Sequence, residues 1–306
     1  MSLIFIFIDG LGIGPSGKNN PFSEHSLPGL EWFAGGKLTS EEFREVARPE
    51  VTIRRIDAKL DVEGLPQSGT GQATLFSGQN AAKLLGRHHG PYPHTKIKPL
   101  LGASSMFGSA KEMGLKCHFM NAFPDRFFEY AEKRNRWSCT TKMCIENGIA
   151  LNRVTDVREG RAITAEIFQD IWQSRLGIEL PDIDEHTAAG RIFSAADRYD
   201  LVLYEFYLTD KAGHAKRKDE AIDALSRIDL LLGALAHSVD KSRHTLLITS
   251  DHGNIEDLSI KTHTMNPVPL LVYGSGAEKF TEITSLTEVS PALLNWLAAL
   301  VWKDAL

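Results

Sequence analysis

Residues 245–254 read TLLITSDHGN, an apolar run that passes directly into Asp251 and His252. Such a run predicts a buried strand, with the aspartate and the histidine at its C-terminal end. Ligands bind at that edge of open α/β sheets. Residues 263–269 (HTMNPVP) begin eleven residues after His252 and add His263. Carboxylate and imidazole ligands suit Zn²⁺ or Mn²⁺, so this edge of the sheet is a candidate metal site.

Two further apolar runs end in the same way. Residues 3–8 (LIFIFI) precede Asp9, and residues 201–207 (LVLYEFY) lead to Asp210, with His214 four residues beyond it. A single aspartate after a strand usually serves as a helix cap or a turn residue. Three aspartates in that position, two of them with a histidine close behind, favour a shared metal site over three unrelated turns.

The composition argues against several classes of protein. The 306 residues, 42% hydrophobic and 24% charged, are typical of a globular protein. A net charge of −5 and the lack of a long Lys/Arg block argue against a nucleic-acid partner. No apolar run approaches the ~18 residues that span a membrane, and the N-terminus lacks the basic region of a signal peptide. Three cysteines without a C-x-x-C pair predict a reducing, cytoplasmic location; the oligomeric state stays open.

Alternating strands and helices predict an α/β fold with a mainly parallel central sheet and helices on both faces. The expected strands cover residues 3–8, 51–56, 116–122, 201–207, 245–248 and 268–273, and the expected helices cover residues 40–46, 104–113, 186–198 and 216–238. A last helix is expected to open with Ser290 as N-cap and Pro291 as its first residue. Residues 124–184 lack this rhythm and predict a small cap subdomain, which leaves 1–123 and 185–306 as the core.

A glycine-rich segment, GLPQSGTGQATLFSG at residues 64–78, carries the candidate nucleophiles. A hydroxyl is a weak nucleophile at neutral pH, but a divalent ion can ionise it without a dedicated base. Ser68 and Thr70 are both candidates, and a plain glycine-rich turn is the alternative reading of the segment. A helix is expected to begin here, with the amides of residues 69–71 available to an anion.

Taken in order, these motifs resemble the alkaline-phosphatase superfamily, most closely the metal-binding domain of cofactor-independent phosphoglycerate mutase and phosphopentomutase. The blocks at residues 251–254 and 263–269 are highly specific, and the Pro-x-Ser-x-x-Gly spacing around Ser68 resembles the mutase nucleophile loop. The resemblance implies an alkaline-phosphatase-like fold. It implies two divalent ions, Zn²⁺ or Mn²⁺, one held by Asp210, His214 and His263 and the other by Asp251, His252 and Asp9. It favours Ser68 as nucleophile over Thr70, although other superfamily members use threonine.

The departures from the family shape the functional hypothesis. The chain is too short for the mutase's large inserted domain, and the sulfatase signature is absent around Ser68. We therefore expect a phosphomonoesterase or phosphodiesterase that acts on a small phosphorylated molecule through a phospho-serine. The first alternative is a phosphomutase on a small sugar or glycerate phosphate. The second, from another class, is a non-catalytic metal-bound binding or regulatory module.

The resemblance assigns no residue to substrate binding. Basic side chains that follow the nucleophile segment or lie in the predicted cap are the candidates: Arg87, His88, His89, His94, Lys96, Arg126, Arg134, Arg136 and Lys142. Glu256 and Asp257 are expected to be solvated or capping residues rather than additional ligands. Cys139 and Cys144 are expected to be buried as small apolar residues.

Overall fold

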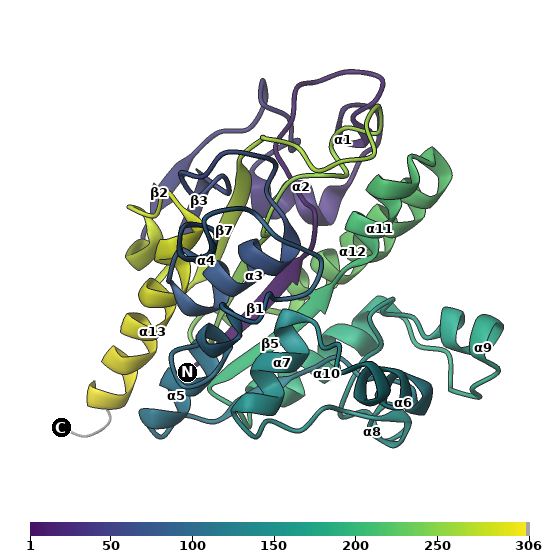
Figure 1. The fold of residues 1–306 in the computed structure, drawn as a ribbon, viewed down its shortest axis with the longest axis vertical. Helices are drawn as coiled ribbons and strands as arrows, with labels where there is room; N and C mark the ends of the chain where they lie inside the picture. Colours follow the sequence, from purple (N-terminus) through teal and green to yellow (C-terminus); the bar gives the residue numbers. More distant parts are fainter. Residues whose placement is uncertain (304–306) are drawn as a thin grey trace.

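A single seven-stranded sheet forms the centre of the molecule, in the order β2-β3-β7-β6-β1-β5-β4. The structure, a computed structural model, describes residues 1–303 (Figure 1). The strands are β1 (Ser2–Ile8), β2 (Val46–Arg48), β3 (Val51–Ile56), β4 (Cys117–Phe119), β5 (Leu201–Phe206), β6 (His244–Thr249) and β7 (Val268–Gly274).

The centre of the sheet is parallel, and one side of it is antiparallel. Strands β4, β5, β1 and β6 run the same way, whereas β7 runs antiparallel to β6, β3 to β7 and β2 to β3. Antiparallel neighbours need no crossover helix, so residues 250–267 can pass from β6 to β7 as a loop. The predicted α/β class is confirmed, in the form of a mixed sheet with a parallel centre.

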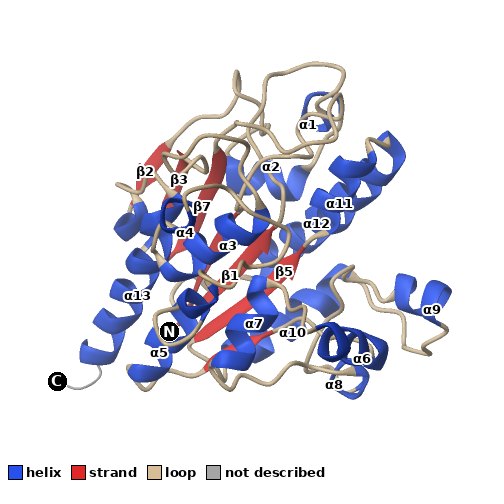
Figure 2. Cartoon of the chain, in the orientation of Figure 1, coloured by secondary structure: helices blue, strands red, loops and turns tan. Residues whose placement is uncertain are grey.

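Helices cover both faces of the sheet (Figure 2). Along β1, Ile4, Ile6 and Ile8 pack with α2 (Pro28–Ala34), α10 (Glu185–Ala196) and α12 (Lys218–Ser238). The alternate residues of β1 pack on the opposite face with α3 (Ser68–Ser77), α5 (Met106–Glu112), α7 (Cys139–Glu146) and α13 (Leu286–Lys303). The remaining helices are α1 (Pro21–Glu24), α4 (Ala81–Leu85), α6 (Asp125–Arg134), α8 (Val154–Arg158), α9 (Asp170–Leu176), α11 (Leu208–Ala215), and the 3-10 turns η1 (Lys98–Leu101) and η2 (Ala277–Phe280).

Two of the expected helices are placed differently. Residues 40–46 form turns that lead into β2, because pairing of β2 with β3 outweighs the local helical preference. The last helix begins at Leu286, so Pro291 lies inside it rather than at its first position. Pro291 packs against Gly78 at the end of α3, and the Ser290 hydroxyl donates to the carbonyl oxygen of Phe76 instead of capping a helix.

The segment predicted to form a cap divides its packing among three hydrophobic clusters. Ile163 and Ile167 belong to the core cluster that includes α10 and α12. Val157, Trp172 and Leu180 belong to a small cluster of their own, near the β4 edge. Helix α7 instead packs into the main core through its buried residues Cys139, Met143 and Cys144. The boundaries 124–184 therefore stay a prediction. Within residues 1–303, no helix has the length and hydropathy needed to cross a bilayer.

Candidate metal centre

Six acidic and histidine side chains gather where the parallel strands end. Asp9 follows β1, Asp251 and His252 follow β6, and Asp210 and His214 lie one helical turn apart on α11, which follows β5. His263 comes from the loop between β6 and β7. Because β5, β1 and β6 are parallel neighbours, their carboxyl ends meet at one edge. Two groups of three result, each with its possible ligand atoms within 4.8 Å of one another: Asp9, Asp251 and His252, and Asp210, His214 and His263.

The first group, hereafter the inner group, consists of Asp9, Asp251 and His252 and is buried. The His252 Nε2 atom lies 3.4 Å from Asp9 Oδ1 and 3.4 Å from Asp251 Oδ2. Asp9 Oδ1 is buried without a hydrogen-bond partner. Two carboxylates thus face one imidazole in a site with no Lys or Arg ion pair among the described residues. A buried carboxylate without a cation is costly, which suits a site that takes a divalent ion.

Burial dominates the titration of the inner group. It raises the pKa of Asp251 to about 7, with the charge of Asp210 adding to the effect. Burial and then the charge of Asp251 raise the pKa of Asp9 well above its usual value. Burial also lowers the pKa of His252 to about 3, so its imidazole is neutral at pH 7. A neutral imidazole is the form that binds a metal.

The second group, hereafter the outer group, consists of Asp210, His214 and His263 and reaches solvent. The Nε2 atoms of the two histidines lie 3.1 Å apart, and each is 3.4 Å from an oxygen of Asp210. Their Nδ1 atoms bond to the carbonyl oxygens of Lys261 and Pro66, at 2.7 Å and 2.6 Å. Since a carbonyl only accepts, each Nδ1 carries a proton, and each Nε2 faces Asp210, to which it donates when protonated and beside which it can bind an ion when it is not.

The outer group is already neutralised in part by its own members. The hydrogen bond with Asp210 raises the pKa of His214 to about 9. Burial would raise the pKa of Asp210, but hydrogen bonds from His214 and His263 outweigh burial and lower it. The Asn254 amide also donates to Asp210 Oδ1 at 2.6 Å. A divalent ion entering this group must therefore displace a proton from His214 at neutral pH.

The donor sets and their spacing fit divalent ions. Ligands about 2.0 Å from a tetrahedral ion lie about 3.3 Å from one another. In the inner group His252 Nε2 lies 3.4 Å from one oxygen of each aspartate, and in the outer group the two Nε2 atoms lie 3.1 Å apart and 3.4 Å from different oxygens of Asp210. Carboxylate and imidazole donors suit both Zn²⁺ and Mn²⁺, so the donor set does not choose between them.

Ser68 lies beside the inner group, as the first residue of α3. Its hydroxyl Oγ is 3.0 Å from His252 Nε2. A Cβ at Gly71 would come within 2.8 Å of the Asp251 carbonyl oxygen, so glycine lets α3 pack directly on the ligand segment. The start of α3 is thereby held against the metal ligands, with the serine hydroxyl facing them.

Thr70 has a different environment from Ser68. Its hydroxyl donates to the carbonyl oxygen of Gln67 at 3.1 Å and accepts from the His89 amide at 3.2 Å. The amides of Thr70 and Gly71 also donate to the Gln67 carbonyl oxygen. These two amides are therefore engaged within the turn, contrary to the expectation that they would be available to an anion.

Three side chains at the site were missed or misjudged in the sequence. The Gln72 amide, one helical turn after Ser68, donates to Asp9 Oδ2 and Asp251 Oδ2, at 3.0 and 3.2 Å. Glu256 is buried, not solvated as expected, and accepts hydrogen bonds from the amides of Gly12 and Asn254 and the side chains of Thr264 and Asn266. Glu205 is a buried carboxyl on β5 whose pKa is raised to about 7, chiefly by burial.

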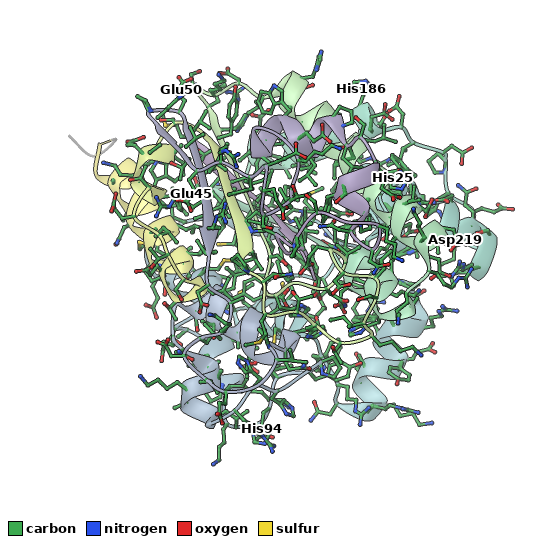
Figure 3. All side chains as sticks on the ribbon, turned by 90° about the horizontal axis from the view of Figure 1, so that it is seen from above. His25, Glu45, Glu50, His94, His186 and Asp219 are labelled. Carbon is green, nitrogen blue, oxygen red and sulfur yellow. The ribbon has the colours of Figure 1, made fainter. Side chains whose placement is uncertain are left out.

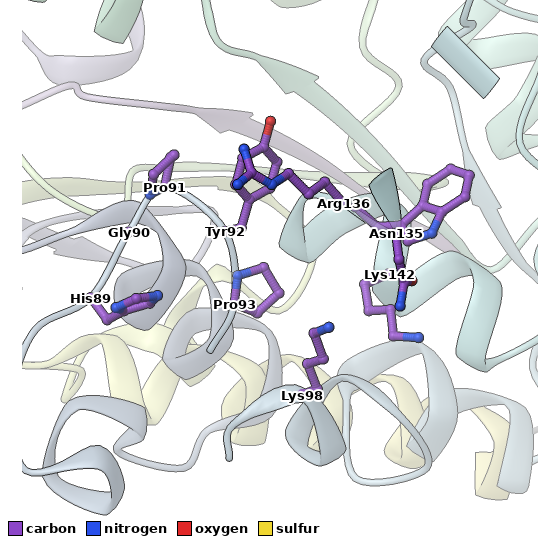
Figure 4. A pocket seen from close by; sticks show the side chains of 10 residues that line it. His89, Gly90, Pro91, Tyr92, Pro93, Lys98, Asn135, Arg136 and Lys142 are labelled. Carbon is purple, nitrogen blue, oxygen red and sulfur yellow. The ribbon is translucent and has the colours of Figure 1, made fainter. Parts of the chain in front are cut away.

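The candidate substrate-binding residues separate into different places. His89, Arg136 and Lys142 line one cavity (Figure 4), whereas Arg87 and Lys96 are not among its lining residues. His94 lies at the periphery of the molecule (Figure 3). The imidazole of His88 contacts the carbonyl oxygens of Lys59 and Val62. Arg126 lines a separate cavity, and Arg134 lies over the ring of Tyr130.

The comparison with known families covers nearly the whole chain. The family model of the metalloenzyme superfamily matches residues 1–299. The chain belongs to this superfamily. The prediction that it is an enzyme is thereby confirmed, and membership of the superfamily implies divalent metal ions, for which the two groups are the candidate ligands.

Named relatives resemble only part of the chain. A 2,3-bisphosphoglycerate-independent phosphoglycerate mutase of Synechocystis is 38% identical over 114 residues, which are 32% of this chain and 21% of the mutase. Another from Pseudomonas fluorescens is 30% identical over 126 residues, 38% of this chain and 25% of that protein. The match thus spans about a quarter of the length of these relatives.

Solved structures share the fold of this metalloenzyme over almost its full length. The alkaline phosphatase of the Antarctic bacterium TAB5 aligns with a TM-score of 0.56 at 13% identity, covering 97% of both chains. The phosphoglycerate mutase of Leishmania mexicana aligns with a TM-score of 0.50 at 12% identity, covering 97% of this chain and 95% of the mutase. At such identities the likeness establishes the fold alone.

Proposed function

We propose that this metalloenzyme hydrolyses a small phosphomonoester or phosphodiester through a phospho-Ser68 intermediate, with two divalent ions, Zn²⁺ or Mn²⁺, as cofactors. The observation that carries the proposal is the 3.0 Å approach of Ser68 Oγ to His252 Nε2, inside the inner group. Ions bound at the two groups would supply the charge that ionises the serine and stabilises the phosphoryl oxygens.

The chain's own residues would position the reaction. Ser68 Oγ attacks phosphorus, the bond from phosphorus to the leaving oxygen breaks, and the alcohol departs with a proton. Water then cleaves the bond between phosphorus and Ser68 Oγ, which releases phosphate from a monoester substrate or a phosphomonoester from a diester substrate. Helix α3 holds Ser68 in place, and the Gln72 amide holds the carboxylates of Asp9 and Asp251 in one orientation.

A phosphomutase is the second candidate, favoured by the names of the relatives. A mutase must keep its dephosphorylated intermediate and exclude water, which usually requires a closing lid. In this chain the His214 side chain is 45% exposed. An outer group open to water favours hydrolysis. Membership of an enzyme superfamily disfavours the third alternative, a non-catalytic binding module.

The test compares Ser68→Ala with Thr70→Val in protein stripped of metal and reloaded with Mn²⁺ or Zn²⁺. With aryl phosphomonoesters and phosphodiesters, Ser68→Ala should lose turnover by a factor on the order of 10³ or more while binding the same amount of metal. Thr70→Val should keep its turnover, because the Thr70 hydroxyl bonds to the backbone of Gln67 and His89 and not to the metal ligands. Acid-quenched wild-type protein should carry phosphate on the peptide that contains Ser68.

Turnover retained in Ser68→Ala but lost in Thr70→Val would move the nucleophile to Thr70. Turnover retained in both variants would assign the attack to water. Release of an isomerised phosphate ester in place of inorganic phosphate would identify a mutase.

A further inference from the structure

A cavity of about 410 Å³ opens beside the turn that carries Ser68. One wall is the loop of residues 89–93 with Lys98 of η1, and the other is residues 135–137 with Lys142 of α7 (Figure 4). Small-molecule sites are concave and range from about 300 to 1,000 Å³. The cavity, hereafter the basic pocket, is thus large enough for the leaving group of a small substrate.

One wall of the basic pocket, the loop of residues 89–93, contacts the nucleophile turn directly. A Cβ added to Gly69 would lie 2.5 Å from the Tyr92 carbonyl oxygen and 2.7 Å from that of His89. Gly90, which lines the same wall, lies beside the nucleophile itself, since a Cβ there would come 3.3 Å from the Ser68 amide nitrogen. The pocket therefore lies one residue from Ser68, and a substrate whose phosphoryl group meets Ser68 has the pocket as its neighbour.

The lining of the pocket is cationic. Lys98, Arg136 and Lys142 come from three different elements, and none of the lining residues is acidic, although the chain as a whole has a net charge of −5. Lys142 forms an ion pair with Glu146, which does not line the pocket. The Arg136 guanidinium lies 5.8 Å from the centre of the Tyr92 ring. The aromatic contact helps to hold this charge in place.

We propose that the basic pocket binds a second phosphate group on the substrate, so that this metalloenzyme acts on small bisphosphorylated compounds. The inference rests on the proposed function, because it places the reacting phosphoryl group at Ser68. Three cations exceed what a single carboxylate needs, whereas a phosphate dianion offers three oxygens and twice the charge. Tyr92 and Trp137 give the pocket apolar sides against which a carbon chain can pack.

Three probes of equal chain length separate the possibilities: propyl phosphate, the bisphosphate of propanediol, and phosphooxypropanoate, which carries a carboxylate in place of the second phosphate. The bisphosphate should exceed propyl phosphate in kcat/KM by roughly 10- to 100-fold, the range of one or two charge-assisted hydrogen bonds. Lys98→Met and Lys142→Met should each move this ratio toward one. Lys96→Met, an exposed lysine outside the pocket lining, is the matched control and should keep the ratio.

Glu146→Gln adds a test in the opposite direction. It removes the partner of Lys142 without touching the pocket lining, so the preference for the bisphosphate should increase. Equal kcat/KM values for the bisphosphate and propyl phosphate would overturn the proposal. A preference for phosphooxypropanoate would overturn the assignment of the second group as phosphate.

Binding separates failure of this inference from failure of the proposed function. In Ser68→Ala protein, calorimetry should show tighter binding of the bisphosphate than of propyl phosphate, and Lys142→Met should remove the difference. If wild-type protein turns over no ester but this binding difference is present, the proposed function fails and the pocket assignment stands. If propyl phosphate is hydrolysed but the binding difference is absent, the pocket assignment fails alone.

Discussion

The inner and outer groups use the same residue types in opposite environments. Asp251 and His252 are fully buried and carry the two unfavourable shifts, a carboxyl with its pKa raised to about 7 and an imidazole with its pKa lowered to about 3. In the outer group, the pKa of Asp210 is lowered and that of His214 is raised to about 9, because each stabilises the other's charge. The inner group needs a cation from outside, whereas the outer group already holds a proton in its place.

The difference indicates how one edge of the sheet can serve two purposes. Strand ends that bury their carboxylates build a rigid site at a cost in stability, which a bound ion would offset. A helix and a loop that reach solvent build a site that can exchange protons and admit substrate. The inner group suits activation of Ser68, and the outer group suits contact with the leaving group and with water.

The largest expected effect comes from neutralising the inner group. Asp251→Asn should lower the metal content from two ions to one and reduce turnover by a factor on the order of 10³, the range seen when one key electrostatic contact is removed. Metal analysis by mass spectrometry and ester turnover are the measurements. Full activity with one ion per chain would mean that the inner group does not serve catalysis. The inner group would then not be the one that activates Ser68.

The next effect is on stability: removing a carboxylate from the inner group and removing one from the outer group should change the free energy of unfolding in opposite directions. In the presence of a chelator, Asp9→Asn should raise the free energy of unfolding by about 1–3 kcal/mol, because it removes a buried charge that has no cation partner. Asp210→Asn should lower it by about 1–3 kcal/mol, because His214, His263 and Asn254 lose a charged acceptor. Urea unfolding of both variants measures the two changes, and changes of the same sign would contradict the contrast.

A smaller effect is expected from the amides that orient each group. Gln72→Met should weaken binding at the inner group by about 10-fold, and Asn254→Ala should weaken binding at the outer group by a similar factor. Competition with a chromogenic chelator resolves the two affinities. Loss of both ions in either variant would show that the groups bind their metals as one unit.

The smallest effect is the pH dependence of His214. Its pKa rises on folding from 6.5 to about 9, so the stability it contributes is fully present below pH 6.5 and is lost as the pH rises to 9. Since the side chain is 45% exposed, solvent screening limits the contribution to less than about 1 kcal/mol. Urea unfolding of chelator-treated protein at pH 6.5 and 9 should show this loss, and His214→Gln should flatten it. If the free energy of unfolding of the wild type depends on pH in the same way as that of His214→Gln, then His214 does not hold a proton in the outer group.

The sequence was informative wherever a residue follows an apolar run. Asp9, Asp210 and Asp251 could be predicted to meet because parallel neighbours end at one edge. Strand direction was less accessible: an apolar run looks the same in either direction, so the reversal at β7 was not predicted. The division of the six residues into two groups came from resemblance, and the structure places possible ligand atoms of the same residues within 4.8 Å of one another in each group.

The roles of side chains that contact residues distant in sequence could not be predicted from the sequence. Glu256 looks solvated among polar neighbours, yet its carboxylate accepts from Gly12, more than two hundred residues away. Gln72 lies within a helix that was considered only for its candidate nucleophiles and its glycines. A glutamine one turn after a candidate nucleophile serine would have been the signal, because positions i and i+4 share a helix face.

The central position of β1 has a consequence for how the protein is made. On the ribosome, Leu3 emerges long before its partner Leu201, and Ser2 long before His244. At about 5–20 residues per second, the most apolar strand of the sheet waits roughly 10–40 s for its first neighbour. Translation thus leaves the apolar segment of β1 exposed, and a chaperone that shields it would raise the yield of folded enzyme.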